Sequence, residues 1–405
     1  MHKKILILTV TAGEGHNSVC RCLQNKFLSY NDVDVKTVDL FKQYGSKTQC
    51  YIVNDGYKAA CKYALNTYNL IFRKMVKNGA SKKDTSAAQK VAAKFMPVIL
   101  NEILTFKPDV IICTHFYPGI IVSNLKRMYN LPTTTGLIIT DYGISPYWDA
   151  CTGIDYLFTP CEEIGEDFLK MGYIEDQIKC FGLPVKECFS SEFKKNELKD
   201  KLNLSYDMLT VSLMTGGGGF GGIEKMFKSL LKVKTPLQII VMNGKDKKSL
   251  KKIDKLSKYN KNNHKITNLG FVDDNSIYLK ASDCLVGKCG GISTTESLCL
   301  KLPLISHDKL AQQELNNLNY LTNKDACFVI NKENKLNEII EKLANDQELL
   351  NSKISNVEKI RKPKATENIC EFLLNHDNID YTDFMKLKGL SKKDTDIQFK
   401  KIRGK

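Results

Sequence analysis

The sequence predicts an α/β protein with two doubly wound domains, and three observations support this fold class. Continuous apolar runs such as 108–113 and 135–140 are typical of parallel strands buried on both faces. Strand-like runs alternate with helical spacing both before and after residues 181–185. The chain has 405 residues, 42% hydrophobic and 26% charged, so it is globular and too long for one ordinary core.

The first half opens with a strand, a loop and a helix. Residues 4–10 form an apolar strand that ends in the loop 11–16, and Val19, Leu23 and Phe27 follow at helical spacing. A second strand, 33–38, ends at Asp39. The stretch 44–105 lacks strand alternation and is expected to be helical. Its aromatic side chains alternate with basic ones in a way that suits an interface: Tyr51, Tyr57, Tyr63, Tyr68 and Phe72 among Lys58, Lys62, Arg73, Lys74 and Lys77.

The segment Phe181-Gly182-Leu183-Pro184-Val185 interrupts regular structure, and we place the domain boundary there. The predicted domains are 1–185, 186–365 and a C-terminal helix with a basic tail, 366–405. Further strands are expected at 209–214, 237–242, 266–269 and 283–286, which predicts a second α/β sheet.

Composition limits the class of partner. The net charge of +15 and the pI near 9.0 suit nucleic acid, anionic lipid or acidic metabolites, and a plain lysine-rich surface explains them equally well. The absence of a long apolar run and of a signal-like start predicts a cytosolic protein. The 14 cysteines are scattered without a Cys-x-x-Cys pair, which disfavours zinc and disulfides.

Each half carries a glycine loop at the end of a strand. Gly217-x-Gly219-x-x-Gly222 can hold phosphate against backbone amides, and we favour this reading over a simple tight turn. In the first half, Gly13-x-Gly15 with Asp39 downstream imitates an NAD site, although Ser18 replaces the third glycine. NAD is therefore the second choice of chemistry.

The segment 288–296, Lys-Cys-Gly-Gly-Ile-Ser-Thr-Thr-Glu, is the most informative part of the chain. It reads as a strand tip, a glycine turn and a helix with hydroxyl groups and one carboxylate. A buried strand and a polar helix start with Gln312, Gln313, Glu314 and Asn317 follow. An α/β domain presents a diphosphate-sugar in this way, so the segment indicates an enzyme that handles nucleotide sugars.

Two side chains are candidates for proton transfer. His16 lies where a strand ends and a helix begins, so it is either a general base or a polar residue of the helix start. Asp141 follows the buried run 135–140, where the carboxyl end of a parallel strand faces an active site; it could equally be a cap or turn residue.

Several spaced motifs together resemble one family. They are Gly13-x-Gly15-His16, Thr140-Asp141-Tyr142 with Trp148, Gly182-x-Pro184-Val185, the loop 214–222, Gly270-Phe271-Val272 and the segment 288–296. Over residues 3–325 the chain resembles the GT-B glycosyltransferases of the monogalactosyldiacylglycerol synthase and processive diacylglycerol glucosyltransferase group, glycosyltransferase family 28. This resemblance implies two Rossmann-like domains facing a central cleft. It also implies inverting transfer of glucose or galactose from a UDP-sugar to a lipid, with diacylglycerol as the leading acceptor, and neither metal nor cofactor.

The resemblance also implies roles for individual residues. His16 and Asp141 would be catalytic, and Glu296 would take the ribose hydroxyls. Gln313 and Glu314 would read the sugar. The implied donor site consists of Gly217, Gly218, Gly219, Phe271, Val272, Gly291, Ser293, Thr294, Thr295, Glu296, Gln313 and Glu314, and the implied acceptor site of Gly13, Gly15, Tyr142 and Trp148.

The sequence departs from the family pattern in four places. Ser145 and Cys161 stand where histidine is common, Cys289 replaces a common Pro, and residues 306–311 replace a proline-rich strand exit. Two alternatives stay open: a UDP-sugar-binding regulatory protein and a UDP-N-acetylglucosamine epimerase-like enzyme. The expected partners are a UDP-sugar, a lipid acceptor and an anionic membrane surface, with no nucleic acid. The expected location is cytoplasmic, peripheral on the inner face of the cell membrane.

Overall fold

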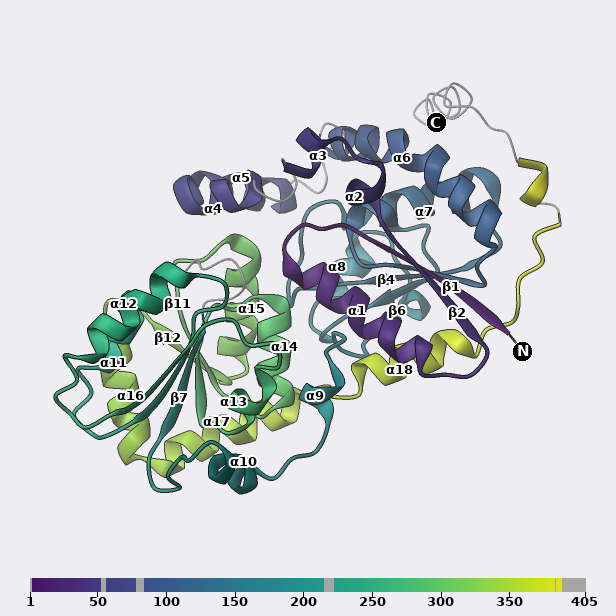
Figure 1. Cartoon of the computed structure of the whole chain (residues 1–405). Helices are drawn as coiled ribbons and strands as arrows, with labels where there is room; N and C mark the ends of the chain where they lie inside the picture. Colours follow the sequence, from purple (N-terminus) through teal and green to yellow (C-terminus); the bar gives the residue numbers. More distant parts are fainter. Residues whose placement is uncertain (1, 52–55, 78–83, 215–221, 383, 388–405) are drawn as a thin grey trace. The chain divides into compact units, whose positions relative to one another are not determined.

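The computed structural model describes residues 2–51, 56–77, 84–214, 222–382 and 384–387, and the chain divides into two compact units. Unit 1 contains Met1–Val185 and Lys364–Lys405, and unit 2 contains Lys186–Pro363. Each unit holds one six-stranded sheet in which all the strand pairs are parallel, with helices packed on its faces (Figure 1). The prediction of two doubly wound sheets is confirmed.

The sheet of unit 1 has the strand order β2-β1-β3-β4-β5-β6. Its strands are β1 (Lys3–Thr9), β2 (Val33–Asp39), β3 (Val110–Cys113), β4 (Thr134–Ile138), β5 (Tyr156–Phe158) and β6 (Ile178–Lys179). Its helices are α1 (Glu14–Leu28), α2 (Leu40–Tyr44), α3 (Lys47–Tyr51), α4 (Tyr57–Tyr63), α5 (Leu65–Lys77), α6 (Asp84–Phe106), α7 (Phe116–Tyr129), α8 (Gly165–Lys170) and α18 (Ala365–Leu374), with short 3-10 turns η2 (Trp148–Cys151), η3 (Glu175–Gln177) and η4 (Phe384–Leu387). The side chains of β1 and β3 fill the core because both strands lie inside the sheet.

The sheet of unit 2 has the order β12-β11-β10-β7-β8-β9. Its strands are β7 (Thr210–Met214), β8 (Gln238–Met242), β9 (Lys265–Leu269), β10 (Cys284–Gly287), β11 (Leu304–His307) and β12 (Cys327–Ile330). Its helices are α9 (Glu187–Ser190), α10 (Lys195–Lys201), α11 (Ile223–Leu230), α12 (Lys247–Ser257), α13 (Ser276–Lys280), α14 (Gly291–Cys299), α15 (Gln312–Asn323), α16 (Leu336–Asn345) and α17 (Gln347–Ile360). The apolar faces of α11 and α16 meet the sheet in one core around Phe227, Ile239 and Ile340.

The C-terminal segment belongs to unit 1. The sequence set residues 366–405 apart without assigning them to either sheet. In the structure α18 packs beside α1 (Figure 1), and Ile369 and Leu373 are fully buried. Beyond α18, the Tyr381 hydroxyl donates to the carbonyl of Pro108 at 2.6 Å. Unit 1 is thus built from two separate pieces of the sequence.

The region 44–105 is helical over its described residues except Gly45, Ser46 and Ala64, close to the prediction. Within the part of the chain that the structure describes, no helix has both the length and the apolar character needed to cross a bilayer.

Candidate functional site

The turn between β10 and α14 leaves the amino end of a helix open. Gly287 ends β10 where the carbonyl oxygen of Met214 would lie 2.6 Å from an added Cβ atom, so only glycine fits beside β7. Gly290 is the N-cap residue of α14, and no side chain there accepts a hydrogen bond from the first turn of the helix. The amide groups of the first turn, at Gly291, Ile292 and Ser293, therefore point their N–H bonds outward, as an anion-binding helix start requires.

The three hydroxyl side chains after this turn have different surroundings. Ser293 is half-buried and lies in the first turn of the helix, whereas Thr294 is fully buried. The Thr295 hydroxyl donates to the Gly291 carbonyl at 2.8 Å, so its proton is used in a hydrogen bond within the helix. Ser293 is accordingly the hydroxyl best placed to meet a ligand.

Glu296 lies in the second turn of α14 and is only 8% exposed. Burial raises the pKa of this carboxyl to about 8, and the nearby Lys186 ammonium lowers it in part. A carboxyl group in this state is protonated in much of the neutral pH range. A buried acid of raised pKa at a strand-end helix is a common feature of ligand sites.

The first turn of α15 lies next to the same turn. Gln313 and Glu314 are half-buried there, and the Lys288 ammonium lies 3.9 Å from a Glu314 carboxylate oxygen. The buried Asn317 amide donates to the Cys289 carbonyl at 2.8 Å, which fixes the turn against α15. The structure therefore brings together the residues predicted in 288–296 and 312–317.

The exit of β11, where the sequence departs from the family pattern, carries positive charge. His307 accepts a hydrogen bond at Nδ1 from the Lys309 amide. Its pKa is lowered by burial first and then by Lys288, and Lys225 contributes in the same direction. Lys225 of α11 and Lys288 of the turn before α14 are thus close enough to this exit to favour the binding of an anion there.

Phe271 and Val272 follow β9 on the surface. The Phe271 side chain is 60% exposed, and the Lys245 ammonium lies 5.2 Å from its ring centroid. The predicted residues Gly217, Gly218 and Gly219 lie outside the described residues. Gly222, with φ +67°, is the N-cap residue of α11.

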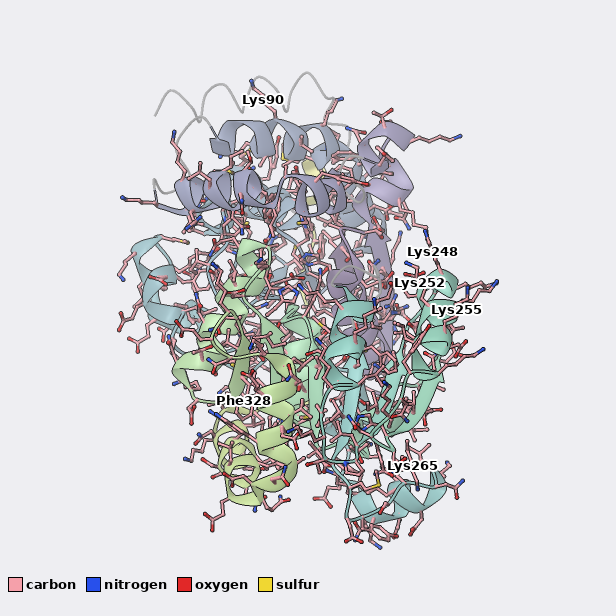
Figure 2. All side chains as sticks on the ribbon, turned by 90° about the vertical axis from the view of Figure 1, so that its left-hand side faces the viewer. Lys90, Lys248, Lys252, Lys255, Lys265 and Phe328 are labelled. Carbon is pink, nitrogen blue, oxygen red and sulfur yellow. The ribbon has the colours of Figure 1, made fainter. Side chains whose placement is uncertain are left out.

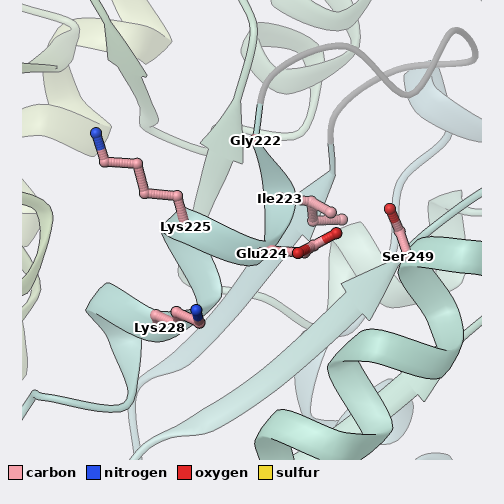
Figure 3. A pocket seen from close by; sticks show the side chains of 6 residues that line it. All are labelled: Gly222, Ile223, Glu224, Lys225, Lys228 and Ser249. Carbon is pink, nitrogen blue, oxygen red and sulfur yellow. The ribbon is translucent and has the colours of Figure 1, made fainter.

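A pocket of about 420 Å³ opens beside the start of α11. Glu224 and Ser249 extend toward one another across it from α11 and α12, whereas Lys225 points away (Figure 3). The Glu224 carboxylate is held by Lys252 at 2.8 Å. Among the described residues, none of the predicted donor residues lines this pocket, whereas Gly222, the last glycine of the predicted phosphate loop, does.

In unit 1, His16 lies in the first turn of α1 behind Gly13, whose φ of +83° favours glycine. The His16 Nδ1 atom lies 2.5 Å from the Thr114 carbonyl oxygen. A carbonyl can only accept, so Nδ1 carries the proton and Nε2 keeps its lone pair. Burial lowers the pKa of His16, while the Thr114 carbonyl and Asp141 raise it. The imidazole is therefore a neutral base with a fixed tautomer.

His115 is a site residue that the sequence reading missed. Its ring centroid lies 4.6 Å from that of His16, edge to face, and burial together with His16 sets its pKa well below the ordinary value. Its Nδ1 accepts from the Tyr117 amide at 3.2 Å and caps α7. The signal was available: Thr114 and His115 follow the buried run 108–113 as Asp141 follows 135–140.

The other predicted residues of unit 1 surround the same strand ends. Asp141 acts electrostatically on His16, so the two predicted catalytic groups lie near each other. Tyr142 and Trp148 are both buried, and the Phe116 ring meets Trp148 edge-on at 6.2 Å. Tyr147, between them, has φ +80°, an uncommon conformation for a tyrosine that often marks a functional site.

Asp39, the acid of the alternative NAD reading, is used by the fold. One carboxylate oxygen accepts from the Lys42 amide at 3.1 Å and caps α2, and the other accepts from the Thr11 hydroxyl. Both oxygens are thus engaged by the protein itself.

Among the described residues, no group of three or more His, Cys, Asp or Glu side chains is arranged to hold a metal ion.

Comparison with known proteins shows which families the chain resembles. Residues 16–185 match the family model described as monogalactosyldiacylglycerol (MGDG) synthase, and residues 210–360 match that described as glycosyl transferases group 1. The chain is 24% identical to a processive diacylglycerol beta-glucosyltransferase of Bacillus licheniformis over 96% of this chain and 99% of the relative. It is 27% identical to the enzyme of that name from Staphylococcus saprophyticus over 92% of this chain and 93% of the relative.

Solved structures share the fold. MurG of Acinetobacter baumannii has a TM-score of 0.63 at 11% identity, covering 92% of this chain and 100% of the other. UDP-GlcNAc 2-epimerase of Neisseria meningitidis, bound to UDP-GlcNAc, has a TM-score of 0.60 at 14% identity with the same coverage. The chain has a GT-B fold and resembles the monogalactosyldiacylglycerol synthase and processive diacylglycerol glucosyltransferase group.

Proposed function

We propose that the chain is an inverting hexosyltransferase that moves glucose or galactose from a UDP-sugar to a lipid acceptor, with diacylglycerol as the leading candidate. The observation that carries this proposal is the pairing of an open helix start and a buried carboxyl group, Glu296, at the end of β10. The whole-length similarity to diacylglycerol glucosyltransferases supports the reaction class.

The donor is bound by unit 2 in this proposal. The amides of Gly291 and Ser293 and the Ser293 hydroxyl meet the diphosphate, and Lys288 adds positive charge. Glu296 takes the two ribose hydroxyls, and the backbone at Phe271 and Val272 meets uracil. Gln313 and Glu314 contact the sugar hydroxyls from the first turn of α15.

The acceptor is activated by unit 1. A hydroxyl oxygen of the lipid attacks the anomeric carbon while the bond from that carbon to the diphosphate breaks, so the configuration inverts and UDP leaves. The hydroxyl proton passes to Nε2 of His16, the nitrogen that the Thr114 carbonyl leaves unprotonated. Asp141 stabilises the imidazolium that results.

The lipid would be reached through a membrane-facing surface on α4 and α5. Tyr63, Leu70 and Ile71 are 78%, 64% and 54% exposed, next to the exposed Arg73, Lys74 and Lys77. Exposed apolar groups beside basic ones are typical of helices that lie in a bilayer interface. Phe72, which the sequence grouped with these residues, is only 6% exposed and so does not belong to this surface. The side chains of Tyr57, Lys58 and Lys62 lie outside the described residues.

The test is transfer itself. The protein is incubated with UDP-glucose, UDP-galactose or UDP-N-acetylglucosamine and with diacylglycerol in neutral detergent micelles, and the lipids are analysed by mass spectrometry. We expect a hexosyl-diacylglycerol from one of the UDP-hexoses. Glu296→Ala should abolish it, whereas Glu348→Ala, an exposed glutamate of α17, should not.

The same experiment separates the alternatives. Conversion of UDP-N-acetylglucosamine without any acceptor would favour the epimerase-like reading, whose fold is the same. Binding of UDP without transfer to any lipid would favour a regulatory protein. Either result would contradict the proposed transferase.

A further inference from the structure

A lysine-rich face covers α12 in unit 2. Residues 245–265 contain nine lysines and two aspartates, with no arginine and no glutamate. We call the side chains of Lys247, Lys248, Lys251, Lys255 and Lys258 the α12 lysine face. All five are exposed.

The packing of α12 fixes this face toward solvent. Ile253 is fully buried and belongs to the core of unit 2, with Leu256 packed against that core. At 3.6 residues per turn, Lys248, Lys251 and Lys255 fall within an arc of roughly 60° on the other side of the helix. Lys248, Lys252 and Lys255 follow one another along the outside of α12 (Figure 2). The lysines therefore form one continuous stripe.

The charge of the stripe is not neutralised by the protein. Asp246 is engaged as the cap of α12, accepting from the amides of Lys248 and Ser249. Asp254 accepts from the Asn268 side chain at 2.6 Å, and Lys252 alone pairs with an acid, Glu224. Across the described part of the chain, no carboxylate lies within ion-pair distance of any member of the α12 lysine face.

The chemistry of the stripe favours a broad anionic surface over a single bound anion. Lysine is a compact charge without the planar fork by which arginine recognises one phosphate group. At the carboxyl end of the helix, Tyr259 is 70% exposed and offers the amphipathic ring that suits a membrane interface.

We infer that the α12 lysine face binds an anionic phospholipid bilayer, as an electrostatic contact of unit 2 that is separate from the α4–α5 surface of unit 1. The choice of a bilayer rests on the proposed function, since a diacylglycerol acceptor lies in a membrane. Each lysine near such a surface adds to the attraction, which salt screens.

The test uses the full chain and vesicles of phosphatidylcholine with increasing phosphatidylglycerol, measured by flotation at low and high salt. The variant is Lys248→Gln/Lys251→Gln/Lys255→Gln. The control, Lys201→Gln/Lys332→Gln/Lys342→Gln, removes the same charge from exposed lysines elsewhere in unit 2. We expect about 100-fold weaker partitioning of the variant at low salt and a shallower salt dependence, with a much smaller change in the control.

Two readouts keep this inference distinct from the proposed function. Transfer to diacylglycerol in neutral micelles should be unchanged in the variant. If the wild type shows no transfer in these micelles, the proposed function fails, and vesicle binding still tests the α12 lysine face. Equal vesicle binding by the variant and the control would overturn the inference. Binding of an RNA oligonucleotide under conditions where the protein does not bind phosphatidylglycerol vesicles would also overturn the inference.

Discussion

Glu296 links the stability of unit 2 to pH. Its pKa of about 8 in the folded chain lies above the ordinary value of 4.5, so the folded state binds the proton more tightly than the unfolded state. The stability that this proton contributes is complete below pH 4.5 and is lost as the pH rises through 8.

We therefore predict that the free energy of unfolding of Glu296→Gln exceeds that of the wild type by about 4 kcal/mol at pH 8, with little difference at pH 4.5. Glutamine keeps the shape and removes the ionisation. Urea unfolding followed at several pH values measures the difference. A gap that does not grow with pH would show that Glu296 does not titrate as described.

Donor binding should show the opposite preference. Two ribose hydroxyls donating to the carboxylate stabilise its ionised form, so UDP affinity should rise between pH 6 and pH 8 with release of a proton. Calorimetry in two buffers of different ionisation enthalpy measures this release. With UDP-glucose, whose diphosphate has no ionisation in this range, both the proton release and the pH dependence should disappear in Glu296→Gln; their persistence would place the ribose elsewhere.

His16 should affect turnover more than donor binding. His16→Gln should lower kcat by about 10²- to 10⁴-fold and leave UDP affinity unchanged, because the base acts only on the acceptor. The lowered pKa of His16 predicts that kcat of the wild type, at saturating donor, is lost only at acid pH, below the ordinary histidine range. Steady-state kinetics across pH checks both points, and a matched loss of UDP affinity would contradict this role.

Residue types at strand ends pointed to part of the site. His16, Asp141 and Glu296 were found because each follows a strand or a glycine turn, and the structure sets His16 near Asp141. The sequence did not indicate which aromatic side chains are buried. Trp148 and Phe72 are core residues. Tertiary packing, and not residue type, decides which aromatic ring faces solvent. The tautomer of His16 depends on the Thr114 carbonyl, 98 residues away in the sequence.

At the scale of elements, long buried strands were predicted and short ones were not. The run 237–242 became β8 within one residue at its start. β5 and β6 have three and two residues, too few for any periodicity, and the strand β12 was also missed. The strand order and the return of α18 to unit 1 depend on contacts between distant segments, which a local pattern does not contain.

The packing of α18 against the rest of unit 1 should contribute measurably to the stability of that unit. Leu373 is fully buried in unit 1, so Leu373→Ala should destabilise that unit by about 2–4 kcal/mol through lost burial and a cavity. Leu374→Ala, at a half-buried neighbour, is the matched control and should cost less. Urea unfolding with a probe in unit 1 measures both. Equal effects of the two changes would argue against the packing of α18.

For the whole molecule, the two units differ in how their sequences are arranged. Unit 2 is one continuous segment, Lys186–Pro363, and its core residues all come from within it. Unit 1 needs Lys364–Lys405 in addition to Met1–Val185, since Ile369, Leu373 and Tyr381 complete its core. A unit that contains its whole core can fold alone, whereas one that lacks part of it leaves apolar surface exposed.

We predict that a fragment of residues 186–363 folds cooperatively and binds UDP with an affinity near that of the full chain, because all the proposed donor residues lie within it. A fragment of residues 1–185 should be largely unfolded or aggregated, and adding a separate peptide of residues 364–405 should restore structure to it. Circular dichroism, urea unfolding and UDP titration measure these outcomes. A stably folded 1–185 fragment would show that the C-terminal segment contributes little to unit 1, and a folded 186–363 fragment that ignores UDP would remove the donor site from unit 2.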